Sequence, residues 1–239
     1  MTTTSHATKS GLTKTELAEQ FRAFIDPEFV ITDDETLKPY ECDGLAMYRE
    51  MPMLVVLPET VQQVQRVMRI CHEQGVPVVA RGAGTGLCAG AMPHKEGVVL
   101  SLAKFNRILE VDPLARTARL QPGVRNLAIS EEAAQFGLYY GPDPSSQIAC
   151  TIGGNVAENS GGVHCLKYGL TVHNLLSVES TATENAVNLS LVQLDPLPDS
   201  HPTFRASPKR SACAKAALVD LLQKAFFYPP GPIAWPSEK

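Results

Sequence analysis

A run of small and polar residues with the sequence RGAGTGL has the composition of a loop that holds phosphate; it comprises Arg81, Gly82, Ala83, Gly84, Thr85, Gly86 and Leu87. Glycine permits close approach and left-handed backbone conformations, so successive N–H groups can point towards one anionic group. The threonine hydroxyl and the arginine add further donors. On this run alone, a pyrophosphate-binding loop and an ordinary tight turn between two strands are equally good interpretations, because glycine-rich turns are common.

The spacing of these glycines excludes two common nucleotide-binding motifs. The segment from Gly82 to Gly86 departs from the G-x-G-x-x-G pattern of dinucleotide-binding folds, and no helix clearly begins within it. The chain also contains no Gly-Lys-Ser/Thr sequence, which a P-loop requires.

Two further polar clusters follow along the chain. The first joins PDPSS at 142–146 to TIGGN at 151–155, and the second is ENSGG at 158–162. Prolines restrict the backbone, hydroxyl and N–H groups donate hydrogen bonds, and glycine pairs admit a flat or anionic group. Each cluster alone also fits a surface loop or turn. The three clusters together, at these separations, are far more specific than any one of them.

The elements that must position the first loop form a βαβ unit. Residues 54–57 predict a short strand, and a helix follows from about residue 61 to Gly75. Its inward-facing residues are predicted to be Val61, Val64, Val67, Met68 and Cys71. The continuous apolar run Val76–Ala80 predicts a second strand, buried on both faces, that leads directly into the glycine loop. Upstream, Thr13 and Glu16 form a capping-box pattern for a helix at 14–24.

Short apolar segments predict a second group of strands. They lie at 98–102, 107–111 and 117–120, and a helix capped by Asn126 is expected to end at Gly137. The long loop from Gly141 to Gly154 is of the length that usually carries function. After Ser177 the sequence is polar and broken by prolines, with one possible helix at 212–227. These elements predict an α+β fold.

Composition narrows the class of protein. The 239 residues include 44% hydrophobic and 19% charged residues, as in soluble globular proteins. The net charge of −4 and the lack of a basic patch argue against nucleic acid as a partner. No apolar run spans a membrane and no secretory signal begins the chain, so we expect a cytoplasmic protein. Six well-separated cysteines without a C-x-x-C pair favour reduced thiols and no metal site.

Three long segments carry a family resemblance. They are LVVLPETVQQVQRVMRICHEQGVPVVARGAGTGLCAGA, LSLAKFNRILEVDPLARTARLQPGV and GLYYGPDPSSQIACTIGGNVAENSGGVHCLKYGLTVHNLL. Together they resemble the FAD-binding domain of the vanillyl-alcohol oxidase / p-cresol methylhydroxylase (PCMH) superfamily. The similarity is greatest to the group that contains the flavin-binding chain of glycolate oxidase and the D-lactate dehydrogenases, and it covers about Tyr40 to Leu176. It implies a PCMH-type FAD-binding domain, with a βαβ-containing small subdomain and a mixed-sheet subdomain, incomplete at its C-terminal side.

The resemblance implies FAD as the cofactor, bound along the three clusters. The implied binding residues are Arg81, Gly82, Ala83, Gly84, Thr85, Gly86, Leu87, Pro142, Asp143, Ser145, Ser146, Thr151, Gly153, Gly154, Asn155, Gly161 and Gly162. The first seven would wrap the pyrophosphate, and neutral N–H groups at this density suit its roughly two negative charges.

The resemblance stops near Ser177. The family's later Gly-Ser/Thr-Glu-Gly-x-Leu-Gly segment and its His-Gly-Asp-Gly-Asn motif are absent. We therefore expect residues 1–39 to be an N-terminal helical extension, 40–177 a partial FAD-binding domain, and 178–239 a non-family tail without regular order. A shifted reading frame or an unrelated fused end would produce such a tail. Missing strands after Leu176 would leave open sheet edges.

The implied activity is oxidation of a 2-hydroxy acid, glycolate or D-lactate, by hydride transfer to flavin. We expect turnover to be impaired in this chain, because the substrate domain of the family is absent. The alternative is a non-catalytic fragment that binds FAD or a partner. The family's glycolate-type enzymes work with companion subunits, one of them carrying iron–sulfur clusters.

No catalytic residue is assigned from the sequence. His164 and His173 are candidate bases, but neither has a carboxylate at recognisable spacing, so packing or surface roles are preferred. The electron acceptor and the choice between the two hydroxy acids are left open.

Overall fold

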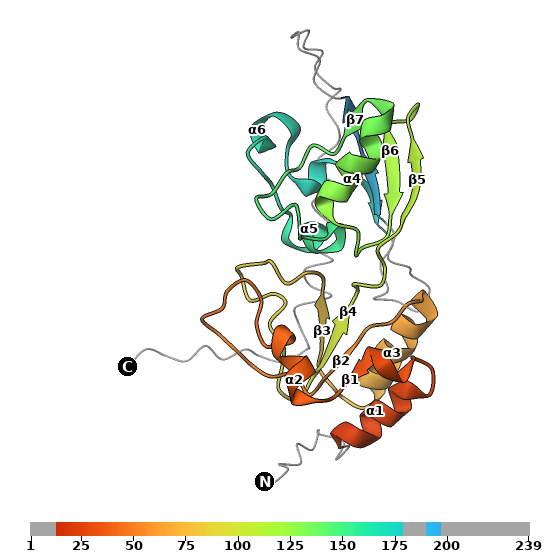
Figure 1. The fold of residues 1–239 in the computed structure, drawn as a ribbon, viewed down its shortest axis with the longest axis vertical. Coiled ribbons are helices and arrows are strands. Elements are labelled where there is room, and N and C mark those ends of the chain that lie inside the picture. The colour runs from red at the N-terminus through yellow and green to blue at the C-terminus, as the bar shows by residue number, and fades with distance from the viewer. Residues whose placement is uncertain (1–12, 179–189, 197–239) are drawn as a thin grey trace.

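Two units, each built on a four-stranded sheet, make up the described part of the chain (Figure 1). The structure is a computed structural model, and it describes residues 13–178 and 190–196. The α-helices are α1 (Lys14–Arg22), α2 (Asp34–Leu37), α3 (Val61–Glu73), α4 (Asn126–Ala133), α5 (Ile152–Glu158) and α6 (Cys165–Tyr168). Short 3-10 turns lie at Pro27–Phe29, Lys38–Tyr40, Ala134–Phe136 and Thr171–His173.

The first unit contains the predicted βαβ arrangement. Its strands are β1 (Val30–Ile31), β2 (Leu54–Val56), β3 (Val78–Arg81) and β4 (Val98–Ser101), in the order β1-β2-β4-β3. Strand β4 is parallel to both neighbours, and β1 is antiparallel to β2. Helix α3 makes the crossover from β2 to β3, and β4 is inserted between them. The carboxyl ends of the parallel strands therefore share one edge of the sheet.

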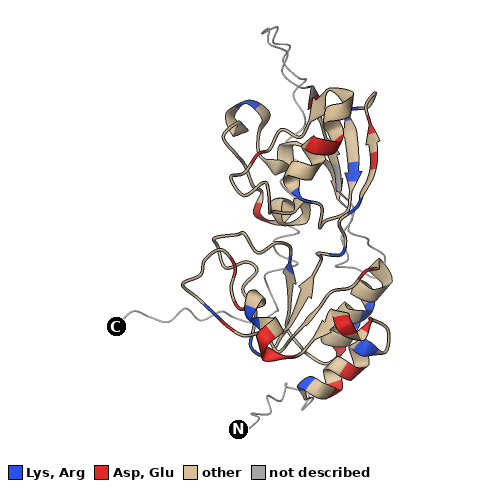
Figure 2. Cartoon of the chain, in the orientation of Figure 1, with Lys and Arg blue, Asp and Glu red and all other residues tan. Residues whose placement is uncertain are grey.

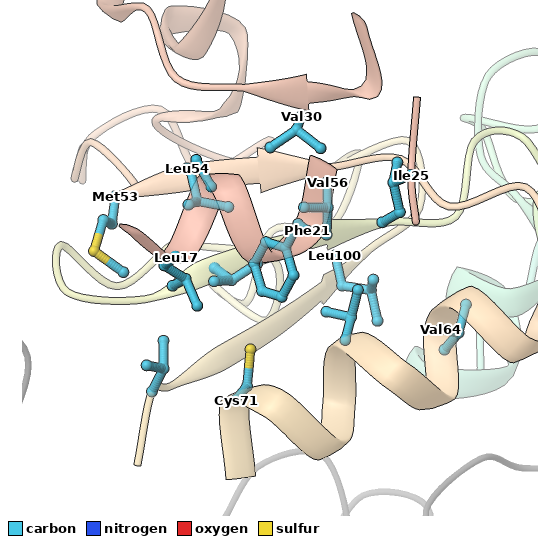
Figure 3. Close-up of a cluster of buried hydrophobic side chains, with 14 of the residues drawn as sticks. Leu17, Phe21, Ile25, Val30, Met53, Leu54, Val56, Val64, Cys71 and Leu100 are labelled. Atoms are coloured by element: carbon cyan, nitrogen blue, oxygen red, sulfur yellow. The ribbon is translucent and has the colours of Figure 1, made fainter. Parts of the chain in front are cut away.

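A hydrophobic core on one face of this sheet fixes the position of β3. Phe21 of α1 lies at its centre with no exposed surface, surrounded by side chains from α3 and the strands, among them Val64 and Cys71 (Figure 3). The predicted capping box of Thr13 with Glu16 is confirmed, and Thr60 with Gln63 forms a second one at the start of α3. Helix α1 therefore packs into this core, although residues 1–39 were expected to form an extension.

Strand β3 is less buried than its apolar sequence suggests. Three of its four residues are half-buried, whereas all four residues of β4 are buried. The prediction that this strand is covered on both faces is wrong because β3 lies at the sheet edge and lines a pocket.

The second unit is an antiparallel sheet. Its strands are β5 (Ile108–Asp112), β6 (Thr117–Leu120), β8 (Leu175–Val178) and β9 (Ser190–Gln193), in the order β5-β6-β9-β8. Strands β7 (Leu138–Tyr139) and β10 (Asp195–Pro196) form a separate pair. The expectation that no strand follows Leu176 is wrong. Strand β9 fills the place between β6 and β8, with Ala118 opposite Val192 and Leu175 opposite Val192 on the other side.

The second core lies between this sheet and helices α4 and α5. Leu120, Ile129, Ile152 and Leu194 are fully buried within it. Together, the two units confirm the predicted α+β class. The possible helix at 212–227 and nearly all of the expected tail lie outside the described residues.

Two local predictions in this unit need correction. The predicted loop was expected to run to Gly154, yet Ile152 begins helix α5, which includes Gly153 and Gly154. Glycine is favoured there because a side chain on Gly153 would lie 2.7 Å from Pro122 Cβ. Asn126 is not the cap of α4 but its first residue, and its amide donates to the carbonyl of Pro142 at 3.1 Å.

Candidate functional site

A pocket of about 740 Å³ lies between the two units. The first unit contributes β3 and the loop that follows it, and the second contributes residues 146–160, which include α5 (Figure 1). This volume is in the usual range for a site that takes a cofactor or a small molecule. Of the residues implied by the family resemblance, those that line the pocket are Arg81, Gly82, Ala83, Gly84, Thr85, Gly86, Leu87, Ser146, Thr151, Gly153, Gly154 and Asn155.

The glycine loop offers a row of available backbone donors. No backbone carbonyl among the described residues accepts a hydrogen bond from the N–H groups of residues 82–87. Gly84 has φ +68°, a left-handed conformation that directs neighbouring N–H groups away from the regular strand direction. Partly covered N–H groups without acceptors favour an anion that supplies the missing acceptors. The loop can therefore hold a phosphate without a cation beside it.

Gly82 and Thr151 bring the two units into contact at the pocket. A side chain on Gly82 would collide with Oγ1 of Thr151, so only glycine allows this approach. Thr151 directly precedes α5, and its backbone pairs with Arg125 within the second unit. The glycine loop is therefore held against α5, which brings the two predicted clusters into one site.

Two buried polar atoms at this contact lack partners among the described residues. They are the hydroxyl oxygen of Thr151 and the side-chain nitrogen of Asn155. Both residues line the pocket, and Asn155 is only 2% exposed. An unsatisfied buried polar atom typically costs about 1–3 kcal/mol, so such atoms normally have a partner. A bound group with acceptor atoms would supply one.

Arg81 does not direct its charge into the pocket. Its guanidinium group donates to backbone carbonyls, including that of Cys42 at 2.8 Å, and the residue is buried. Burial lowers the pKa of Arg81, although the nearby Cys42, Tyr40 and Asp43 act in the opposite direction. The expectation that its side chain adds a donor to phosphate therefore does not match its geometry.

The remaining implied residues lie beside the pocket rather than in its lining. They are Pro142, Asp143, Ser145, Gly161 and Gly162. A side chain on Gly162 would collide with Asp143, so the loop carrying Gly161 and Gly162 lies directly on the PDPSS segment. The interpretation that His164 has no carboxylate partner is wrong, because its Nδ1 lies 2.6 Å from Asp143 Oδ2.

The pocket also includes residues that were not expected. Glu158 is the clearest example, since a side chain on Gly86 would lie 3.6 Å from its carboxylate oxygen Oε1. Glu158 belongs to the ENSGG cluster, but the sequence alone did not show which side of α5 it occupies. Pro122 and Val178 come from turns and strands far along the chain, and no local pattern identifies them.

Charge is sparse in this pocket. Among the described residues that line it, Arg81 is the only lysine or arginine and Glu158 is the only acidic one. Figure 2 shows acidic and basic residues interspersed over both units rather than gathered at the site. In the part of the chain that the structure describes, no three His, Cys, Asp or Glu side chains gather to hold a metal ion. The site therefore suits a large, partly anionic organic group bound by neutral donors.

Comparison with known proteins identifies the organic group for which this pocket is suited. A family model described as an FAD binding domain matches residues 52–185, which include all the described residues that line the pocket. The chain belongs to this family. FAD is its cofactor, and the unpaired donors at the glycine loop, Thr151 and Asn155 fit the acceptor-rich diphosphate and flavin of that molecule.

Two relatives indicate which members of the family this chain is similar to. The chain is 59% identical over 167 residues to glycolate oxidase subunit GlcD from Escherichia coli (strain K12), covering 70% of this chain and 34% of the relative. It is 38% identical over 157 residues to D-lactate dehydrogenase from Anaerostipes hadrus, covering 65% and 33%. The chain thus spans about a third of the length of the curated relatives it matches.

The fold has a counterpart among solved structures. The crystal structure of p-cresol methylhydroxylase with substrate bound aligns with a TM-score of 0.66 and 21% identity, covering 77% of this chain and 44% of that one. This similarity confirms the predicted PCMH-type fold. Among the described helices, none has the length and apolar character needed to cross a bilayer.

Proposed function

We propose that this chain is the FAD-binding part of an oxidoreductase that acts on a small 2-hydroxy acid, glycolate or D-lactate. The choice of substrate class is supported by the high identity to glycolate oxidase subunit GlcD over the segments that form the pocket. Bound FAD would supply the chemistry by accepting a hydride from the carbon that carries the substrate hydroxyl.

The observation that carries the proposal is the set of donors without partners around the pocket. The N–H groups of residues 82–87 would hold the diphosphate of FAD. The hydroxyl of Thr151 and the amide of Asn155 would bond to neighbouring parts of the cofactor. Gly153 and Gly154, without side chains, would allow a flat group to lie against α5.

The residues beside the pocket would support its wall. Ser146 lines the pocket and would add a hydroxyl donor near the cofactor. Asp143 would hold the loop of Gly161 and Gly162 in place through its contacts with Gly162 and His164. In this arrangement Pro142 and Ser145 fix the course of the PDPSS segment, and the carbonyl of Pro142 is already bonded to Asn126.

The test is an anaerobic titration of the intact chain, reconstituted with FAD, and followed by visible absorbance. We expect glycolate or D-lactate to bleach the flavin band slowly, because turnover is impaired in this chain, and acetate, which lacks the hydroxyl group, to leave it unchanged. Bound FAD that neither hydroxy acid reduces would contradict the oxidoreductase proposal and favour the second candidate.

The second candidate is a fragment that binds FAD or a partner without turnover. It is favoured by the exposed apolar side chains Val163 and Leu166 on and before α6, which are 84% and 100% exposed. Companion subunits, including an iron–sulfur subunit, would cover such a surface in the cytoplasm. Substitution of Leu166 by aspartate should then prevent co-purification, whereas the control Leu114→Asp, at a site 96% exposed, should not.

A further inference from the structure

The guanidinium group of Arg81 bonds to three carbonyls in two other segments of the first unit. Nη1 donates to the carbonyl of Cys42 at 2.8 Å and to that of Ala91 at 3.3 Å. Nη2 donates to the carbonyl of Pro39 at 3.3 Å. The group also lies 5.5 Å from the ring centroid of Tyr40. Because a guanidinium has its donors in a fixed planar arrangement, these bonds set the positions of all three carbonyls at once.

One of these segments lies directly behind the glycine loop. A side chain on Gly44 would lie 2.8 Å from the carbonyl oxygen of Gly86 and 2.9 Å from that of Thr85. The residues that follow Cys42 are thus in contact with the carbonyl side of the loop. Arg81 holds this segment through its bonds to Pro39 and Cys42, and so determines where the loop is supported.

The loop also leaves room for Arg81 itself. A side chain on Gly84 would collide with the guanidinium group, and Gly84 has φ +68°. The loop therefore turns over the arginine, with the side chain beneath it rather than in the pocket. A phosphate on the open side would meet backbone N–H groups, while three of the five arginine donors are already used by carbonyls.

We propose that Arg81 is a positioning residue for FAD rather than a phosphate ligand. It shapes the loop of residues 82–87 so that their N–H groups converge on the diphosphate. This inference rests on the proposed role of that loop in FAD binding. The affinity for the diphosphate then comes from the arrangement of the backbone N–H groups. The positively charged side chain of Arg81 instead forms hydrogen bonds with carbonyls behind the loop.

The test compares Arg81→Lys with Arg81→Met in the intact chain. Lysine keeps the charge, and would serve as a phosphate ligand, but it cannot bond the three carbonyls in one plane. FAD affinity is measured by quenching of flavin fluorescence. We expect both variants to bind FAD at least about tenfold more weakly than the wild type, and by similar factors. Near-wild-type affinity in Arg81→Lys, with loss only in Arg81→Met, would overturn the proposal.

A matched control separates positioning from general loss of stability. Cys71→Ala changes a buried side chain in the same core and should lower the unfolding temperature without changing FAD affinity. In Arg81→Ala, added methylguanidinium should restore FAD binding, compared with sodium chloride at the same ionic strength. No restoration, together with an equal loss of affinity in Cys71→Ala, would show a merely structural role.

A second variant keeps the test decisive if the Arg81 variants do not fold. Gly44→Val leaves Arg81 intact but displaces the carbonyls of Thr85 and Gly86 from behind. We expect it to remain folded and to bind FAD more weakly, and unchanged affinity would contradict the inference. If the wild type itself fails to bind FAD, the proposed function fails as well. If the wild type binds and Arg81→Lys binds equally, only this inference fails.

Discussion

Asp143 Oδ2 lies 2.6 Å from Nδ1 of His164, although 21 residues separate the two in the chain. The carboxylate also accepts the backbone N–H of His164 at 3.3 Å. The pair joins the PDPSS segment to the loop that contains Gly161 and Gly162. A pair of this kind holds a loop in place more than it stabilises the fold, because the His164 side chain is 60% exposed.

Removal of this pair should therefore loosen one loop. We expect His164→Ala to lower the free energy of unfolding by less than about 1 kcal/mol, and Asp143→Ala by more, since it removes both acceptors. Hydrogen exchange should accelerate at residues 161–168 in both variants. The control is His72→Ala, an exposed histidine on α3. Unchanged exchange at 161–168 in the two variants would show that the pair does not hold the loop.

Gly82→Ala tests the contact between the two units. The added methyl group would collide with Oγ1 of Thr151, so the glycine loop and α5 must move apart. We expect FAD affinity to fall at least about tenfold, as measured by fluorescence titration. Gly75→Ala is the matched control, because Gly75 has φ +65° but nothing within 4 Å. It should cost about 1 kcal/mol of stability and leave FAD affinity unchanged.

The substitution Asn155→Leu distinguishes what this side chain contributes to folding stability from what it contributes to FAD affinity. The side-chain nitrogen of Asn155 is buried without a partner among the described residues, so its replacement by an apolar group of similar size should change the free energy of unfolding by no more than about 1 kcal/mol. FAD affinity should nevertheless fall about fivefold or more, because one donor to the cofactor is lost. A strongly destabilised variant with unchanged FAD affinity would place Asn155 outside the binding site.

Alkaline pH should destabilise the first unit through Cys71. Burial raises the pKa of this thiol to about 12, whereas an unfolded thiol ionises near about 8.5. The associated stability is complete below about pH 8.5 and is lost as the pH rises towards 12, because only the unfolded chain releases the proton. The full effect is roughly 5 kcal/mol.

Urea denaturation at about pH 8 and about pH 11 measures this dependence. Cys71→Ala should show a smaller loss of stability between the two pH values than the wild type. Cys88→Ala, which changes an exposed thiol, should retain the wild-type dependence. Equal dependence in all three proteins would show that Cys71 does not control the alkaline response.

Local sequence signals predicted the main helices and strands of the first unit well. The capping box of Thr13 with Glu16 was predicted correctly, since a cap depends on residues only three positions apart. The family resemblance correctly indicated FAD and the PCMH-type fold. The glycine run alone did not distinguish a phosphate loop from a turn, because the residues of α5 that lie against it belong to the other unit.

The wrong secondary-structure and burial predictions concern features that depend on residues far apart in the sequence. The exposure of β3 depends on its place at the sheet edge, which apolar content does not reveal. Strand β9 was missed because it is short and stands between a polar segment and a run broken by prolines. Its pairing with β6 connects residues as far apart in the chain as Ala118 and Val192. Gly153 and Gly154 suggested a loop, but close packing on Pro122 favours glycine within a helix.

The most direct test of FAD binding in this pocket is a titration of the intact chain with FAD, followed by desalting and a visible spectrum of the protein fraction. We expect one FAD to be retained per chain, with quenched fluorescence and with reduced retention in Asn155→Leu and Gly82→Ala. Folded protein that emerges without flavin, while all FAD stays in the low-molecular-mass fraction, would contradict the assignment of this pocket to the cofactor.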